Sequence, residues 1–203
     1  FRYILHQVTA TIDNCIKSWQ IACMHQQPIG IFDSGVGGIS VLKEIKRLLP
    51  DESVIYLGDS ANCPYGSKDE IEAFDLAKKS IDFLISKKCK LIVIACNTVT
   101  AVAIERFRSM YPLPFVGMEP ALKPAVSLTK TGKIGILATQ NTFNGNLFQQ
   151  TRDLHANDME LFIQPGFGLV ELVENGEHNS DKAVNLLEGY LTPMIKNGAD
   201  TLV

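Results

Sequence analysis

Long apolar runs, paired cysteines and a surplus of basic charge are all missing from this 203-residue chain. No apolar run approaches the roughly 20 residues that a membrane-spanning helix needs. The five cysteines form no CxxC pair and have no histidine at metal-ligand spacing, which argues against a zinc site and a disulfide scaffold. With 19 basic against 22 acidic residues the net charge is -3, so the chain has no general attraction for nucleic acid. We therefore expect a cytoplasmic protein with reduced thiols, no metal, and no direct binding to membranes or nucleic acid.

Beyond Pro28 the sequence alternates short apolar runs with amphipathic helical patterns. The apolar runs predict strands that are buried on both faces, and their alternation with helices predicts parallel strands joined by right-handed crossovers. The predicted strands are Ile29 to Phe32, Val54 to Leu57, Leu91 to Ala95, Phe115 to Gly117, Ile134 to Ala138, Leu161 to Ile163 and Thr201 to Val203. The predicted helices are Ile39 to Leu48, Ile71 to Ile85, Val99 to Phe107, Thr142 to Leu154 and Asp181 to about Leu191, before Pro193.

Four prolines between Pro112 and Pro124 interrupt this alternation near the middle of the chain. Because proline discourages both a continuous helix and a central strand, we expect a boundary between two α/β lobes there. The predicted fold class is α/β, with two flavodoxin-like parallel-sheet lobes, helices on both faces of each sheet and a cleft between the lobes. The predicted divisions are 1–27, an extension without an assigned role that includes Met24 as the expected natural start, then 28–117 and 118–203.

Reactive side chains stand where two of the predicted strands end. In a flavodoxin-like strand order, 2-1-3-4, the first and third strands are neighbours, and ligands bind at their carboxyl ends. Asp33 follows the first strand and Cys96 follows the third. We therefore expect these two residues, 63 positions apart (96 minus 33), to meet at one edge of the sheet.

Cys96 is followed by Asn97, Thr98 and a helical pattern, so its thiol is expected near a helix N-terminus. That location favours the thiolate and lowers the thiol pKa from its usual value of about 8.5, which suits a nucleophile or a base. The alternative is a buried cysteine that packs as a small hydrophobic residue. The polar pair that follows favours the reactive interpretation, because a purely structural strand end has less need of an amide and a hydroxyl.

The segment DSGVGG, residues 33–38, forms a glycine-rich turn after the first strand, and we call it the glycine loop. It lacks the lysine of a Walker loop and the GxGxxG spacing of a dinucleotide fold. Its backbone amides are expected either to hold a carboxylate or to form a tight strand-to-helix turn capped by Asp33 or Ser34.

Two further polar segments also have two interpretations each. In the NCPYG loop, residues 62–66, the Tyr65 side chain and the Gly66 amide either bind a small polar ligand or belong to a plain turn, and Cys63 is interpreted as structural. In ILATQNT, another strand end, the polar residues are expected to be either ligands or helix caps. They are Thr139, Asn141 and Thr142.

Five segments together resemble the glutamate racemases of bacterial cell-wall synthesis. They are FDSGVGG at 32–38, GDSANCPYG at 58–66, ACNT at 95–98, VGMEPALKPA at 116–125 and ILAT at 136–139. The likeness runs from Ile29 to the last residue, and DSGVGG favours the glutamate racemases over the related aspartate racemases. The resemblance implies racemisation of L-glutamate to D-glutamate for peptidoglycan synthesis, with no metal, pyridoxal phosphate or other cofactor.

The resemblance also implies roles for individual residues. Cys96 is implied to be a catalytic acid/base, and Asp33 to accept a hydrogen bond from the Cys96 thiol or from the substrate ammonium. Racemisation suits such a site, because it needs one acid/base on each face of a planar carbanionic intermediate. The implied substrate contacts are Asp33, Ser34, Pro64, Tyr65, Gly66, Asn97, Thr98, Thr139 and, by a looser match in LVELVENG, Glu174.

One departure from the family pattern concerns the second catalytic cysteine. In the family it lies in a GCTHxP motif after a strand like ADTLV, and this sequence stops at Val203. We interpret the chain as a C-terminally truncated racemase with an incomplete second lobe, which does not turn over by the two-thiol route. Glutamate is the expected ligand, and a homodimer is the assembly that we include as an expectation.

Two other functions stay open at this point. A thiol-dependent amidotransferase or hydrolase needs a histidine beside Cys96, and no histidine lies in a strand-end motif. His155 and His178 lie in polar stretches and are expected at the surface. The other alternative is an amino-acid-binding or regulatory protein that keeps the cleft but has lost the chemistry.

Overall fold

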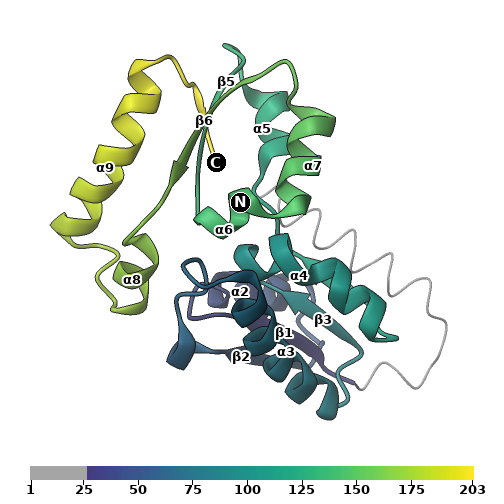
Figure 1. The fold of residues 1–203 in the computed structure, drawn as a ribbon. Coiled ribbons are helices and arrows are strands. Elements are labelled where there is room, and N and C mark those ends of the chain that lie inside the picture. Colours follow the sequence, from purple (N-terminus) through teal and green to yellow (C-terminus); the bar gives the residue numbers. More distant parts are fainter. Residues whose placement is uncertain (1–26) are drawn as a thin grey trace.

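The computed structural model describes residues 27–203, in which two parallel sheets form the centres of two lobes (Figure 1). Residues 1–26, including the expected start at Met24, lie outside the described part of the chain. The α/β fold class with two parallel-sheet lobes is thus confirmed. Over residues 27–203, no helix has the length and apolar character required to cross a membrane.

The first sheet contains four parallel strands in the predicted order, β2-β1-β3-β4. Their bounds are β1 Ile29–Asp33, β2 Val54–Gly58, β3 Leu91–Ile94 and β4 Phe115–Gly117. The two central strands, β1 and β3, are buried along their whole length, which explains their almost uninterrupted apolar sequences. Because Phe32 is in register with Ile94, the segments that follow β1 and β3 leave the sheet side by side.

Helices cover both faces of the first sheet. On one face, Val41 and Ile45 of α2 (Ile39–Leu48) pack against Ile31 and Val93. On the other face lie α3 (Glu70–Ser86) and α4 (Asn97–Met110), whose apolar sides join Phe32 in a second core. A short 3₁₀ helix, η2 (Ser60–Asn62), follows β2.

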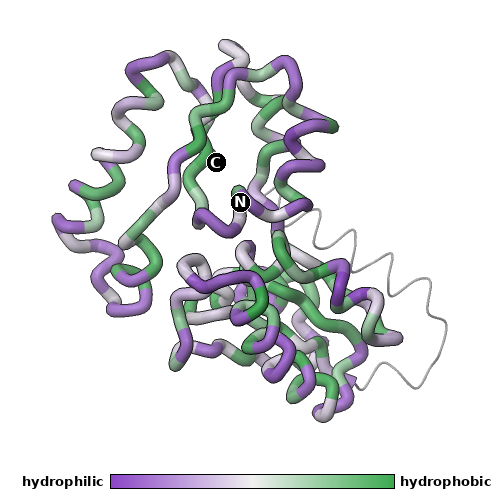
Figure 2. Tube along the Cα trace, viewed as in Figure 1, coloured by the Kyte–Doolittle hydropathy of each residue, from purple (hydrophilic) through white to green (hydrophobic). Residues whose placement is uncertain are grey.

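The second sheet has three parallel strands in the order β6-β5-β7. Its elements are α5 Leu122–Leu128, β5 Lys133–Ala138, α6 Gln140–Asn144, α7 Asn146–His155, β6 Glu160–Pro165, α8 Leu169–Glu174, α9 Asp181–Lys196 and β7 Thr201–Leu202. Helices α5 and α7 cover one face of this sheet and α9 the other, while α6 and α8 lie on the side facing the first lobe (Figure 1). Hydrophobic residues concentrate along the strands of the sheet (Figure 2).

Some helical predictions were wrong in extent. The helix predicted from Thr142 to Leu154 is two helices, α6 and α7, which meet at Gly145 with extended backbone angles. The last helix does not stop before Pro193 but continues through it to Lys196, where its exposed face tolerates the proline ring and the lost hydrogen bond.

Two short helices were not predicted at all. In α5, Pro124 lies in the first turn, where backbone N–H groups have no partner within the helix, so a proline there removes no hydrogen bond. Helix α8 has six residues, which is too short to show a helical periodicity. This second omission matters for the site, because α8 carries Glu174.

Candidate active site

Cys96 lies at the carboxyl end of β3 and forms the N-cap of α4. The Thr100 amide donates a hydrogen bond to the Cys96 carbonyl at 2.9 Å, which begins the helix. Only 5% of the residue is exposed, and its Sγ donates to the Ser34 Oγ at 3.5 Å. The sheet therefore brings the segment after β1 against the segment after β3, as the strand order predicted.

The pKa of the Cys96 thiol is raised to about 11, and the prediction of a lowered pKa is wrong. Burial is the largest cause, because it penalises the thiolate, and the negative charge of Asp33 adds to it. Hydrogen bonds to the ionised sulfur, from the Ser34 hydroxyl and from the Val99 and Ser34 amides, lower the pKa, as a helix start should, but they do not outweigh burial. The free site thus holds Cys96 as a neutral thiol, a proton donor.

Asp33 is buried at the start of the glycine loop, with 7% of its surface exposed. Its Oδ2 accepts hydrogen bonds from the Gly38 amide at 2.8 Å and from the Gly35 amide at 3.4 Å. Burial raises the pKa of this carboxyl above its ordinary value, while the loop amides lower it. The carboxylate thus organises the loop, and the hydrogen-bond partner of the Cys96 thiol is Ser34 rather than Asp33.

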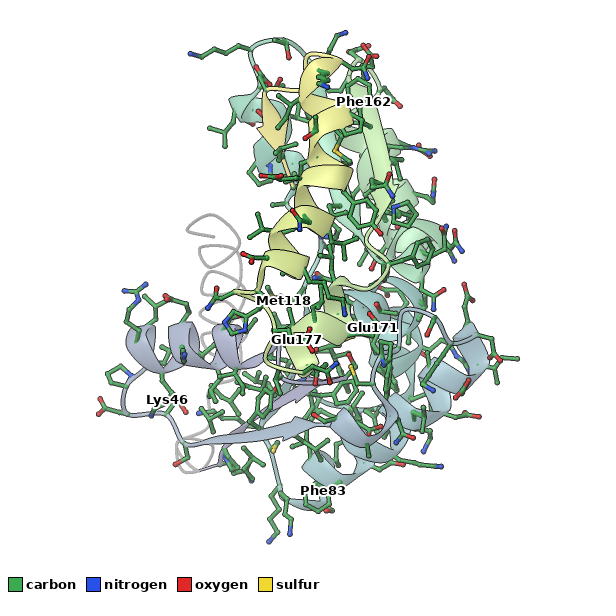
Figure 3. All side chains as sticks on the ribbon, turned by 90° about the vertical axis from the view of Figure 1, so that its left-hand side faces the viewer. Lys46, Phe83, Met118, Phe162, Glu171 and Glu177 are labelled. Carbon is green, nitrogen blue, oxygen red and sulfur yellow. The ribbon has the colours of Figure 1, made fainter. Side chains whose placement is uncertain are left out.

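A second carboxylate reaches the glycine loop from the other lobe. Glu174 Oε1 accepts a hydrogen bond from the Val36 amide at 2.8 Å. A Cβ at Gly35 would lie 2.0 Å from the same oxygen, so a side chain there would displace the Glu174 carboxylate from this position. The loop amides therefore hold two carboxylates of the chain itself. Asp33 holds the tight strand-to-helix turn, as the second interpretation predicted, and binding of a ligand carboxylate by the loop amides stays a prediction. Figure 3 shows α8, with Glu171 labelled on it, between α9 and the first lobe.

The NCPYG loop is anchored by the Tyr65 side chain. Its ring is 1% exposed, and its hydroxyl donates to Asp59 Oδ2 at 2.6 Å. With its side chain held in this way, Tyr65 can offer a ligand chiefly its main chain. Gly66 packs against Thr139 of the second lobe, since a Cβ there would lie 2.7 Å from the Thr139 side chain.

Cys63 and Pro64 complete the NCPYG loop and are both half-buried. Burial raises the pKa of the Cys63 thiol to about 12, with the charges of Glu174 and Asp33 adding to it. The Ser34 side chain close by lowers the pKa of the same thiol. Ser34 therefore has both thiols as neighbours, a proximity that the spacing of the two cysteines did not indicate.

The residues after Cys96 and after β5 meet between the lobes. Asn97 is exposed and Thr98 is buried. Thr98 Oγ1 and Thr139 Oγ1 share a hydrogen bond of 2.8 Å, and Thr139 Oγ1 also lies 2.8 Å from Thr142 Oγ1. Thr139 additionally caps α6 by accepting from the Thr142 amide at 3.2 Å. It is therefore a helix cap and a contact between lobes at once.

Asn141 is neither a cap nor placed at the Cys96 thiol. Its Nδ2 donates to the Lys68 carbonyl at 2.6 Å and to the Tyr65 carbonyl at 3.2 Å. In the described chain His155 and His178 are both exposed, as predicted. The same residues, 27–203, contain no group of three His, Cys, Asp or Glu arranged to hold a metal ion.

Known proteins share both the sequence pattern and this arrangement of lobes. A family model described as Asp/Glu/Hydantoin racemase matches residues 29–203. The chain belongs to this racemase family. The glutamate racemase of Herpetosiphon aurantiacus is 45% identical over 180 residues, which cover 89% of this chain and 71% of that protein. The glutamate racemase of Roseiflexus sp. is 45% identical over 178 residues, covering 87% of this chain and 65% of that protein.

Solved racemase structures agree with this assignment. A glutamate racemase isoform from Bacillus anthracis matches with a TM-score of 0.76 at 31% identity, over 88% of this chain and 67% of that one. The Escherichia coli glutamate racemase, solved with L-glutamate and the activator UDP-MurNAc-ala, matches with a TM-score of 0.74 at 35% identity, over 82% and 64% of the two chains. The resemblance to the glutamate racemases is thus confirmed, and the matched regions span 64% to 71% of the length of these four racemases.

Proposed function

We propose that this racemase-family chain binds glutamate between its lobes and uses Cys96 as one acid/base of a cofactor-independent racemisation that supplies D-glutamate for peptidoglycan. One observation supports this proposal above the others. The Cys96 thiol lies against Ser34 at the end of the central strands, and Glu174 of the other lobe reaches the same glycine loop. A thiol beside the loop that is proposed to hold the substrate is the arrangement that proton transfer at a bound amino acid needs.

The chemistry of glutamate suits the groups around Cys96. Asp33 and Glu174 are carboxylates that attract an α-ammonium group, and the Gly66 amide is the proposed donor to a substrate carboxylate. Hydroxyl and amide side chains near the thiol complete the proposed set of substrate contacts. We assign substrate contact to Asp33, Ser34, Pro64, Tyr65, Gly66, Asn97, Thr98, Thr139 and Glu174. The Francisella tularensis glutamate racemase, a structural relative with a TM-score of 0.75, was solved with D-glutamate.

Proton transfer starts from a neutral thiol. With a pKa of about 11, Cys96 is almost fully protonated near pH 7 and is ready to donate a proton to a carbanionic α-carbon. To act as the base it must first lose that proton. A bound α-ammonium group beside Asp33 brings positive charge into the site, which lowers the thiol pKa and favours the thiolate.

Racemisation also needs an acid/base on the opposite face of the α-carbon. The five cysteines are Cys15, Cys23, Cys63, Cys89 and Cys96, so residues 118–203 include none. We therefore propose that Cys96 alone exchanges the α-proton of one enantiomer with retention of configuration. Glutamate binding without any exchange is the second candidate function, and the raised pKa of the Cys96 thiol, which keeps it from acting as a base, favours it.

The test is proton NMR of L-glutamate and D-glutamate in deuterated water with the 203-residue chain. We expect loss of the α-proton signal from one enantiomer, and Cys96→Ala should abolish this loss. Cys89→Ala is the matched control, because Cys89 is a buried thiol that precedes β3 and so lies at its opposite end. Exchange that persists in Cys96→Ala would contradict the role of Cys96.

Circular dichroism of the glutamate solution provides the second measurement. Net formation of D-glutamate by the 203-residue chain would refute the single-face proposal. Calorimetric titration with both enantiomers separates binding from chemistry: binding with no exchange in the unsubstituted chain supports the second candidate.

A further inference from the structure

We propose that Asn141 is a positioning residue that fixes the NCPYG loop and thereby the Tyr65–Gly66 peptide at which the substrate binds. This inference rests on the proposed function. Asn141 belongs to α6 of the second lobe, and its side chain donates to two carbonyls in the first lobe, at Lys68 and at Tyr65. The two acceptors are 73 and 76 positions away in the sequence, so the contact exists only when the lobes are together.

The orientation of the Asn141 amide follows from its partners. Both neighbours are carbonyl oxygens, which only accept hydrogen bonds, so the NH₂ end of the side chain must face them. The two donors of one nitrogen are thereby both used. Asn141 does not cap α6, because that place is taken by Thr139.

The two carbonyls belong to the first and last residues of a tight turn, residues 65–68. The Lys68 amide donates to the Tyr65 carbonyl at 3.2 Å, and Asn141 joins the two ends of this turn from outside. Gly66, which lies inside the turn, is packed against Thr139 on its other side. The Tyr65–Gly66 peptide is therefore held by the Tyr65 phenol on Asp59, by Asn141 and by Thr139.

Two of these three anchors come from the second lobe. Movement of α6 away from the first lobe would release the turn, since Asn141 and Thr139 would leave together. The loop is therefore in its binding position only in the closed arrangement of the lobes. Asn141 lies away from the Cys96 thiol in the hydrogen-bond network, so it should affect substrate affinity more than proton transfer.

The experiment uses Asn141→Asp, which keeps the size of the side chain but replaces both donors with a carboxylate that repels the carbonyls. Asn141→Ala is a second variant in case the new charge disturbs the fold. The matched control is Asn144→Ala on the same helix, where the exposed Asn144 accepts only from Gln140, at 3.0 Å. Hydrogen exchange of the peptide covering residues 62–68 is measured by mass spectrometry, together with glutamate affinity by calorimetry and α-proton exchange at saturating glutamate.

We expect Asn141→Asp to speed exchange in residues 62–68 and to weaken glutamate affinity by about tenfold, as the loss of two partly buried hydrogen bonds implies. The rate of α-proton exchange at saturation should change far less, and Asn144→Ala should resemble the unsubstituted chain in all three measurements. Unchanged loop exchange and affinity in both Asn141 variants would overturn the proposal. Absence of glutamate binding in the unsubstituted chain would overturn the proposed function instead. Faster hydrogen exchange of residues 62–68 in the Asn141 variants would then still support the claim that Asn141 fixes the loop.

Discussion

At the scale of single residues, Cys96 and Asp33 are coupled without sharing a hydrogen bond. The thiol pKa is about 11 because the residue is buried and because the Asp33 carboxylate is close enough to repel a thiolate. Asp33 in turn is held by the amides of Gly35 and Gly38. The reactivity of the thiol is therefore set partly by a residue whose side-chain hydrogen bonds all lie within the glycine loop.

This coupling predicts the effect of Asp33→Asn. The asparagine oxygen can still accept from the loop amides, but the negative charge is gone, so the Cys96 pKa should fall. The measurement is the pH dependence of thiol alkylation, resolved peptide by peptide with mass spectrometry. Cys89 is the internal control, because its pKa is raised by burial alone and should not move. An unshifted Cys96 profile would show that the Asp33 charge has no influence on the thiol.

The same raised pKa predicts how stability depends on pH. In the unfolded chain the thiol ionises near the ordinary cysteine pKa of 9.0, and in the folded chain near 11. Between these values the folded state binds more protons, so the free energy of unfolding must fall as the pH rises. Cys96→Ala removes this contribution. Below pH 9 the thiol contributes no slope.

Urea titrations at pH 8 and pH 11 check this prediction. Relative to Cys96→Ala, the unsubstituted chain should lose about 2 to 3 kcal/mol of unfolding free energy over that interval. Equal losses in the two proteins would mean that the thiol ionises equally easily in both states.

The sequence predicted which residues meet at this site better than it predicted the protonation of the Cys96 thiol. Strand order alone placed Cys96 beside the segment after β1. The direction of the thiol pKa shift depended on how deeply the packing buries it, which local sequence does not record. The partner of Val36 was likewise beyond prediction, because Glu174 arrives from a six-residue helix without periodicity.

At the scale of elements, Gly145 interrupts a helix that the sequence periodicity predicts as continuous. A continuous helical pattern suggested one helix from Thr142 to Leu154, but the chain turns at Gly145. A Cβ at Gly145 would lie 2.6 Å from the Ala101 Cβ and 2.7 Å from the Ala101 carbonyl oxygen, on α4 of the first lobe. The break therefore serves close contact between α4 and the α6–α7 corner, a tertiary demand that a helical pattern cannot reveal.

Gly145→Ala should act as a wedge at this contact. The backbone of α4 cannot yield easily, so we expect a loss of about 1 to 3 kcal/mol in unfolding free energy. Gly189→Ala is the matched change: Gly189 lies within α9, and its Cβ would meet nothing within 4 Å. This second substitution should stabilise the chain by about 0.5 to 1 kcal/mol, because alanine is the better helix former. Chemical denaturation of both variants tests the pair, and equal effects would contradict the wedge.

At the scale of the whole molecule, polar side chains of the second lobe reach each polar segment at the carboxyl edge of the first sheet. Glu174 bonds to the glycine loop, Asn141 to the turn of residues 65–68 that begins in the NCPYG loop, and Thr139 to Thr98 of α4. The packing of α4 against α6 and α7 supports these contacts. The two-lobe architecture was predictable from the alternation of strands and helices. The links between lobes were not, because they join residues 41 to 138 positions apart.

The Glu174 contact allows the relative motion of the lobes to be measured at one backbone amide. The Val36 N–H donates to Glu174 across the junction, whereas the Gly38 N–H, two residues on, donates to Asp33 within the first lobe. An amide exchanges with solvent only when its hydrogen bond opens, so Val36 reports separation of the lobes and Gly38 reports opening of the glycine loop alone. In Glu174→Ala we expect Val36 to exchange at least about tenfold faster in NMR experiments, since a hydrogen bond to a charged acceptor is lost, and Gly38 to keep its rate.

The control is Glu171→Ala, because Glu171 is an exposed glutamate on the same helix and its removal takes one negative charge from α8. If Val36 and Gly38 accelerate together, the loop opens as a unit and Glu174 does not join the lobes; if neither changes, the contact contributes nothing to closure.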